Sequence, residues 1–475
     1  MASLFIRNSS GLVKRFSMFD LMVLNLANMS AGSALFLGVT PYVGGVAVLW
    51  MAALVTFLIS LPLGLAYTLM SMQLPRTGGD YVWISRKLSP KLSVPVAVAM
   101  TFNMPTYFAL TSYFWSSSFE QILLVMFKID GLGQIPSLGA VATYLVAAIP
   151  FMFLVAINVR RPSAVSRLNT YLSIIACFAV AYGTLVLYLK GVSPLSHSFA
   201  STFSLVPRLN GQPGFSGTLE AVPLLSAFSF IWVFAGPAVA AEARDRKALK
   251  LNVLLSQLLT LALIGVPFYL MKGPVSSSLF YTGLYNFWTL AMYAAGPGAG
   301  WILAIGLIAW EILELSMGIL VFSRYILAMA LDRLLPELLG QINSRGSPVP
   351  AHLLDLLLTL SFLSVPLVSS VGVLALYDFL PLSLVYMGLV AIAATKFSGK
   401  AVKFAGALSL PLLSYLGWAV IMSPYLGLRG NLLWINLVYL VSLLGLGVSI
   451  YLRARVKCKK IGVQLDRIYR EVPPS

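Results

Sequence analysis

Two carboxyl groups lie within one of the most apolar stretches of the sequence. Glu311 and Glu314 belong to "GWILAIGLIAWEILELSMGILVFSRY", and at a spacing of three they share one face of a helix. Because nearby carboxylates repel each other, such a pair is suited to carry a proton or to bind a cation. Alternatively, neighbouring polar groups satisfy both acids, which then only fix the helix in place. Asp378 is a further candidate acid, although it lies near a turn and solvent exposure is the simpler interpretation.

Other side chains narrow the possible chemistry. Ser30, Ser33 and Ser316 could combine with backbone carbonyls around a sodium ion, whereas serines in apolar helices more often bond to their own backbone. Only two histidines and two cysteines occur, in no metal-ligand motif. The sequence also lacks a Gly-rich phosphate loop that ends in Gly-Lys-Ser or Gly-Lys-Thr. We therefore expect neither an enzyme, nor a metal centre, nor an ATP-driven pump.

The elements that must position these residues are membrane helices. Hydrophobic residues make up 59% of the chain and charged residues only 10%, whereas soluble domains carry about 25% charged residues. Stretches of about 20 apolar residues, enough to cross the hydrocarbon of a bilayer, predict about twelve spans. The expected spans are 17–42, 43–72, 92–127, 137–157, 168–189, 222–243, 251–271, 299–330, 349–369, 371–395, 404–424 and 431–453. The fold class is therefore an all-α polytopic membrane protein.

The basic residues predict the orientation. Of the 32 Lys and Arg residues, 27 fall in the two tails and in alternate loops between the expected spans. Such an excess marks the cytoplasmic side, so both termini are expected in the cytoplasm and the protein in the cytoplasmic membrane. The net charge of +17 then reflects topology and not nucleic-acid binding. The basic segment after residue 451 is either a simple flank of the last helix or a contact with anionic lipid.

Two of the expected spans contain helix-breaking residues near mid-membrane. The first has the small residues 30–34, and the sixth has Ala235-Gly236-Pro237. Freed backbone groups are tolerated in a membrane where they line a cavity, and breaks at corresponding positions of two repeats indicate a transport site. Close helix packing through small residues is the alternative.

In the first interpretation, amides at Gly32 to Ala34 would bind a carboxylate and carbonyls near Ala235 and Gly236 an amine. Nearby aromatic residues and an asparagine of the third span would form the walls. The expected binding residues are Ser30, Ala31, Gly32, Ser33, Ala34, Phe36, Asn103, Trp232, Phe234, Ala235 and Gly236.

Four segments resemble the amino acid–polyamine–organocation permeases. They are "QLPRTGGDYVWISRKLSP" at 73–90, "GSALF" at 32–36, "FAGPA" at 234–238 and "SRYILAMALDRLLPELLGQINSRGSPVPAHLL" at 323–354. The resemblance implies a five-plus-five inverted repeat with discontinuous helices one and six and two further helices. It also implies that 73–90 forms a cytoplasmic hinge and a short surface helix, which moves when the inner gate opens.

The resemblance divides the chain into segments. These are a cytoplasmic tail (1–16), a first repeat (17–190), an external loop (191–221), a second repeat (222–395), two further helices (396–453) and a basic cytoplasmic tail (454–475).

Departures from the family pattern limit the mechanism. Pro237 and Ala238 stand where the family often has an aromatic residue and an acid, so an acidic gate there is not expected. The fifth span has no lysine, which excludes coupling through such a residue.

The resemblance implies a secondary transporter, a monomer or homodimer, that moves amino acids or related organic amines by alternating access. No cofactor is expected beyond a coupling ion. Proton coupling through Glu311, Glu314 or Asp378 is favoured, and sodium coupling that involves Ser316 is the weaker possibility. An exchanger of amino acids or polyamines and a non-transporting sensor remain alternatives.

Overall fold

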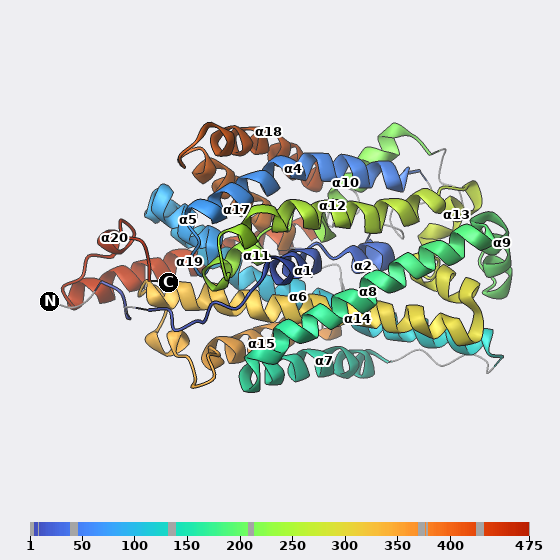
Figure 1. Ribbon diagram of the computed structural model, residues 1–475, viewed down its shortest axis with the longest axis horizontal. Helices are drawn as coiled ribbons and strands as arrows, with labels where there is room; N and C mark the ends of the chain where they lie inside the picture. Colours follow the sequence, from blue (N-terminus) through green and yellow to red (C-terminus); the bar gives the residue numbers. More distant parts are fainter. Residues whose placement is uncertain are drawn as a thin grey trace.

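The computed structural model describes residues 4–7, 9–38, 46–131, 139–207, 213–368, 376, 379–423 and 432–474. Within these residues the regular structure is helical, and the only β-type pairings are two isolated bridges. Both chain termini lie at the same end of the elongated molecule (Figure 1). We call this end the terminal end.

Most of the long helices run roughly parallel to the long axis of the molecule (Figure 1). The long helices are α4 (Leu49–Gln73), α6 (Pro90–Ile129), α7 (Ala140–Arg160), α8 (Pro162–Lys190), α12 (Lys247–Leu270), α14 (Phe287–Leu331), α15 (Val349–Leu363), α17 (Phe379–Ala394), α18 (Lys400–Met422) and α19 (Leu432–Lys460). Shorter elements are α5 (Gly79–Lys87), α9 (Val192–Thr202), α13 (Pro274–Leu279), η3 (Phe280–Thr282), η4 (Glu337–Gly340), α16 (Val365–Val368) and α20 (Leu465–Ile468).

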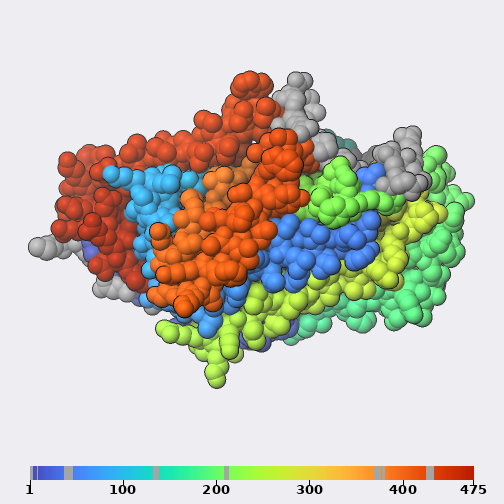
Figure 2. All heavy atoms as spheres, turned by 90° about the horizontal axis from the view of Figure 1, so that it is seen from above, coloured from blue at the N-terminus to red at the C-terminus, as the bar shows by residue number. Residues whose placement is uncertain are grey.

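Nine helices among the described residues are long and apolar enough to cross a membrane. The other three expected spans correspond to α6 and to two shorter apolar helices, α17 and α10 (Phe215–Phe228). Protein buries 83% of the apolar stretch in α14 and in the first span, but only 17% in α19. The first span and α14 are therefore central, and α18 and α19 lie on the outside of the molecule (Figure 2).

The first span is interrupted where the run of small residues predicts it. Helix α1 (Met18–Asn28) begins with a capping box between Ser17 and Asp20 and ends before Ser30, which has a left-handed backbone conformation with φ of 40°. A short turn, α2 (Ala31–Ser33), and a π-helical segment, η1 (Ala34–Gly38), follow. The chain thus changes direction at Met29 and Ser30.

The sixth span is interrupted as well, but not at the expected residues. Helix α10 ends at Phe228, residues 229–234 are not helical, and α11 (Ala235–Ala238) and η2 (Ala240–Glu242) follow. The prediction that the break lies at 235–237 was therefore wrong. Pro237 lies in the first turn of the second half-helix, where its missing N–H removes no helical hydrogen bond.

Element α14 consists of two helical parts that meet at a kink. Gly296, with φ of 82° and ψ of −175°, is not helical, and Pro297 follows it. The longer part, which holds the acids, therefore begins close to the expected residue 299, and a shorter helical part from Phe287 precedes it.

The segment with the paired glycines forms a buried helix. Residues 79–85 of α5 are all buried, so the expectation of a helix on the membrane surface was wrong. Gly78 and Gly79 both have positive φ, and Gly78 N donates to Ala238 O at 2.9 Å. A Cβ atom at Gly79 would lie 2.6 Å from Pro237 O. The paired glycines therefore allow α5 to pack directly on α11.

The C-terminal tail packs on α5 as well. Ile468 and Tyr469 are buried, and the Arg86 guanidinium lies 5.2 Å from the centroid of the Tyr469 ring. Arg86 Nε donates to Glu471 O at 3.3 Å, and Arg76 Nε donates to Pro473 O at 3.0 Å. This part of the tail is therefore docked on protein, which neither expectation for the basic segment included.

Candidate functional site

The acids of α14 face the break in the first span. Glu311 and Glu314 are both buried. Ser33 Oγ donates to Glu314 Oε2 at 2.8 Å and lies 3.3 Å from Glu311 Oε1. The hydroxyls of Ser30 and Tyr107 both donate to Glu314 Oε1, and the two hydroxyl oxygens are 2.5 Å apart. Hydroxyl groups from α6 and from the helix break thus surround one carboxylate.

Gly32 explains how α14 comes so close to the break. A Cβ atom on this residue would lie 2.1 Å from Trp310 Cγ. The indole Nε1 of Trp288 also donates to Gly32 O, at 3.0 Å. Two tryptophans of α14 therefore rest on the backbone of Gly32, and any larger residue would push the acids away from Ser30 and Ser33.

The two acids have no basic partner within the described part of the chain. Among the described residues the ion pairs are Arg15–Glu242, Arg324–Glu242, Arg86–Asp332 and Arg333–Glu337. No Lys, Arg or His nitrogen in this part of the chain lies within 4.0 Å of Glu311 or Glu314. No group of three or more His, Cys, Asp and Glu residues suited to a metal ion occurs in the described ranges either. These acids can thus accept a proton or bind a cationic ligand.

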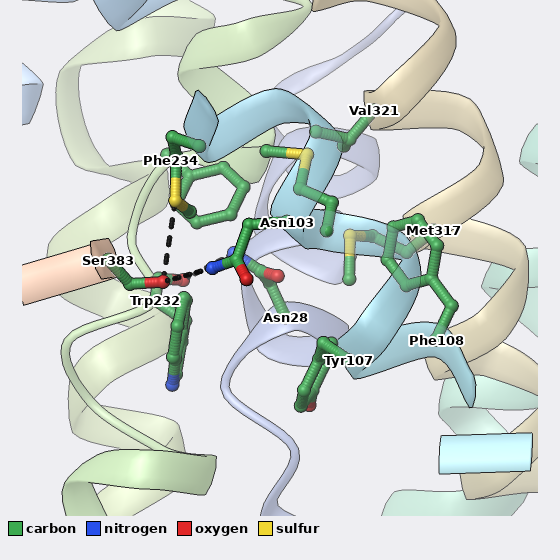
Figure 3. A pocket seen from close by; sticks show the side chains of 12 residues that line it. Asn28, Asn103, Tyr107, Phe108, Trp232, Phe234, Met317, Val321 and Ser383 are labelled. Carbon is green, nitrogen blue, oxygen red and sulfur yellow. Dashed lines mark hydrogen bonds between the residues drawn. The ribbon is translucent and has the colours of Figure 1, made fainter. Parts of the chain in front are cut away.

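A cavity of about 20 Å³ lies beside the acids, between the two helix breaks. We call it the helix-break cavity (Figure 3). Its lining residues are Asn28, Met100, Asn103, Met104, Tyr107, Phe108, Trp232, Phe234, Met317, Gly318, Val321 and Ser383. Tyr107 connects the cavity to the acids, because its ring lines the cavity and its hydroxyl donates to Glu314.

Aromatic rings make up one wall of this cavity. The Tyr107 and Trp232 rings are nearly parallel, with centroids 5.9 Å apart, and the Trp232 and Phe234 rings meet edge to face at 6.0 Å. Trp232 Nε1 donates to Ser226 O at 3.1 Å and to Ala227 O at 3.0 Å, which fixes the indole.

Two asparagines of α1 connect the broken spans. Asn28 Nδ2 donates to Trp232 O at 2.8 Å, and Gly236 N donates to Asn25 Oδ1 at 2.8 Å. Asn25 Nδ2 in turn donates to Asn252 Oδ1 at 2.6 Å. Each of these groups is buried, so the bonds are protected from competition by water.

A second buried acid lies between the cavity and the terminal end. Asp80 of α5 accepts hydroxyl hydrogen bonds from Tyr67 at 2.6 Å, Tyr325 at 2.5 Å and Tyr386 at 2.8 Å. These tyrosines come from α4, α14 and α17, and the Tyr325 ring also meets Phe234 of the cavity edge to face. Burial raises the pKa of the Asp80 carboxyl to about 6, although the three hydroxyls act in the opposite direction. We call these four residues the Asp80 cluster.

Two ion pairs join further elements near the terminal end. Arg324 of α14 binds Glu242 of η2 at 2.7 Å. Arg86 of α5 forms two bonds of 2.6 Å with Asp332, just after α14, and Tyr81 donates to the same acid. Together with the Asp80 cluster, these contacts join α4, α5, α14, α17 and η2.

The structure divides the expected binding residues into three sets. Asn103, Trp232 and Phe234 line the helix-break cavity, and Ser30 and Ser33 contact the acids. The others are buried outside the lining: Ala31, Gly32, Ala34, Phe36, Ala235 and Gly236.

Of the other coupling candidates, the structure describes only Ser316. The Ser316 hydroxyl is buried and forms no hydrogen bond within the described part of the chain. Asp378 lies outside the described residues.

Sequence reasoning missed two parts of the site. Asn28 carries no motif, and its role depends on the non-helical path of residues 229–234. Asp80 follows the paired glycines and is visible in the sequence, but its tyrosine partners come from three distant helices and no spacing rule connects them.

The comparisons with known proteins agree with this architecture. The family model described as amino acid permease matches residues 16–446, which is most of the chain. No curated protein matches the sequence.

Proposed function

Because this chain belongs to the amino acid permease family, we propose that it is a proton-coupled secondary transporter of amino acids or related organic amines. Transport proceeds by alternating access across the cytoplasmic membrane. The family is one of transporters, and the specific support for this mechanism is the meeting of two broken spans beside a buried cavity. We further propose that spans one to five and six to ten form inverted repeats.

The size of the cavity requires movement during binding. A volume of about 20 Å³ holds about one water molecule and is too small for an amino acid. Substrate entry must therefore separate the walls on α6, α14 and residues 229–234. The breaks at Ser30 and at 229–234 are the natural hinges, because the helices are not continuous there.

We propose that the terminal end is cytoplasmic, since 27 of the 32 basic residues belong to the segments expected on that side. Release into the cytoplasm then requires the Asp80 cluster and the Arg86–Asp332 and Arg324–Glu242 pairs to separate or shift. In the proposed cycle, Glu311 and Glu314 take up a proton on one side and release it on the other.

Uptake into proteoliposomes tests the proposal. We expect purified protein to accumulate a class of labelled amino acids or amines when an inward proton gradient is imposed, and to lose accumulation when an ionophore collapses the gradient. Protein-free liposomes are the control. Exchange that ignores the gradient would indicate an antiporter of substrates. Binding without flux would contradict transport and indicate a sensor.

Neutral replacements test the role of the acids. We expect Glu311→Gln or Glu314→Gln to lower gradient-driven accumulation by about tenfold or more and to remove its pH dependence, because a glutamine cannot carry the proton. Glu337→Gln is the matched control, since the Glu337 side chain is 60% exposed and does not line the cavity. Unchanged pH dependence in both variants would exclude these carboxyls as proton carriers.

A further inference from the structure

We propose that the substrate of the helix-break cavity is an organic ammonium ion without a carboxylate, rather than an α-amino acid. This refinement rests on the proposed transport function and concerns the same cavity. It follows from the groups that the protein presents there and from those that it does not.

The hydroxyls near the helix break are already used by a carboxylate of the protein. Ser30, Ser33 and Tyr107 donate to Glu314, and Thr111 Oγ1 lies 3.5 Å from the same acid. A substrate carboxylate would have to compete for these donors. It would also come close to two acids that have no basic partner among the described residues. In a buried site this repulsion is poorly screened, so the arrangement disfavours a third carboxylate.

The cavity wall offers little else to bind an anion. None of its lining residues carries a positive charge. Asn28 Nδ2 donates one of its two N–H groups to Trp232 O, and Asn28 Oδ1 is an acceptor that a ligand can use. An ammonium group is a donor and matches both this acceptor and the nearby acids.

The aromatic wall suits the same ligand. Tyr107, Phe108, Trp232 and Phe234 all line the cavity, and their rings gather on two sides of it (Figure 3). A cation held near the faces of such rings is attracted by their quadrupoles, most strongly by tryptophan. Glu314 lies one helical turn before Met317 and Gly318 of the lining, so the acid and the rings bound one region of the same site. The carboxylates and the aromatic rings thus both favour a positively charged ligand.

Matched ligand triplets test this inference directly. Each triplet contains an amino acid, its decarboxylated amine and the corresponding alcohol: phenylalanine, 2-phenylethylamine and 2-phenylethanol, and leucine, 3-methylbutylamine and 3-methylbutanol. Dissociation constants are measured on the purified wild-type protein by ligand-dependent thermal stabilisation. We expect at least one amine to bind about tenfold or more tightly than both its amino acid and its alcohol. An amino acid that binds as tightly as its amine overturns the inference, as does the absence of amine binding at millimolar concentration.

Two variants separate recognition of charge from general packing. Trp232→Leu should weaken amine binding about tenfold and leave alcohol binding nearly unchanged, because the lost interaction acts on the charge. Trp418→Leu is the control, since Trp418 is 58% exposed on the outside of α18. Glu314→Gln should likewise reduce the preference for the amine over the alcohol. If that variant does not fold, Trp232→Leu still decides, and equal loss of amine and alcohol binding in it counts against the inference.

Flux measurements keep this inference distinct from the transport proposal. Amine binding with the expected ranking but without flux of any ligand would leave the ligand class standing and overturn transport. Flux of amino acids with weak or absent amine binding would support transport and overturn the ligand class.

Discussion

Asp80 is fully buried and still carries a carboxyl group that can ionise in the physiological range. Its three tyrosine partners stabilise the carboxylate by donating to it, while burial disfavours the charge. Because burial outweighs the hydroxyls, the pKa rises to about 6. An Asp80 exposed to water, as in an opened arrangement, would have the ordinary value of about 3.9.

This difference predicts how α5 responds to pH. The buried arrangement binds the proton more tightly, so its stabilisation is complete below about pH 4 and is lost as the pH rises through 6. Between pH 5 and pH 7.5 the ratio of buried to opened Asp80 should fall about tenfold. Hydrogen exchange of the α5 amides, corrected for the intrinsic effect of pH, measures this ratio. Asp80→Asn should exchange equally at both pH values, and a wild-type pH response in that variant would contradict the prediction.

At the residue scale, the sequence predicts which side chains belong to the site better than it predicts their hydrogen-bond partners. The spacing of Glu311 and Glu314 indicates a shared face, and both acids do face the helix break through Ser33. The contact between Glu314 and Tyr107 joins residues 207 positions apart, and no local pattern encodes it. Likewise, Gly236 N donates to Asn25 Oδ1, a bond between residues 211 positions apart that the sequence does not predict.

At the scale of elements, the paired glycines place α5 against α11. Alanine at Gly79 would have to adopt φ of 36° and would place its Cβ atom 2.6 Å from Pro237 O. Gly131 is a matched control, because its φ is 74° and no atom of the described residues lies within 4 Å of an added Cβ.

We therefore expect Gly131→Ala to cost only the left-handed strain of about 1–2 kcal/mol. Gly79→Ala should cost about 1–3 kcal/mol more, because α5 must also move away from α11. Thermal unfolding of both variants in the same detergent measures the difference. Equal destabilisation would show that the close approach to Pro237 contributes nothing.

The helix breaks show which elements can be predicted. The first span is interrupted at its small residues, because low helix propensity and the break coincide there. In the sixth span the same reasoning pointed to Pro237, but a proline is well tolerated in the first turn of a helix. In α14, the non-helical Gly296 lies just before residue 299, at which the sequence predicts the eighth span to begin.

At the scale of the whole molecule, the tail connects the end of the chain to α5. Tyr469→Ala removes a buried ring and its contact with Arg86, so we expect α5 to become more accessible at the terminal end. Trypsin cleavage after Arg86 should then be at least about threefold faster, in proportion to the population of opened α5. Val472→Ala is the control, because Val472 is 49% exposed. Equal cleavage of the two variants would show that the tail does not protect α5.

The overall architecture is the part that sequence reasoning predicted best. Apolar stretches and the four resembling segments predicted an all-α membrane protein of the permease family, and both predictions are confirmed. The docking of the tail was not predicted, because a segment rich in Lys and Arg ordinarily flanks a membrane helix in solvent. The burial of Ile468 and Tyr469 depends on a partner surface that only the folded chain creates.

The bonds from Asn25 and Asn28 to the sixth span have a consequence for energy conversion. Because they connect the first span to residues within and just after the second break, neither span can swing freely while the other stays in place. A protein connected in this way should pass between its end states in a single concerted step. Ions would then seldom leak without cargo, and the number of ions moved per cargo molecule should stay constant across a wide range of driving forces.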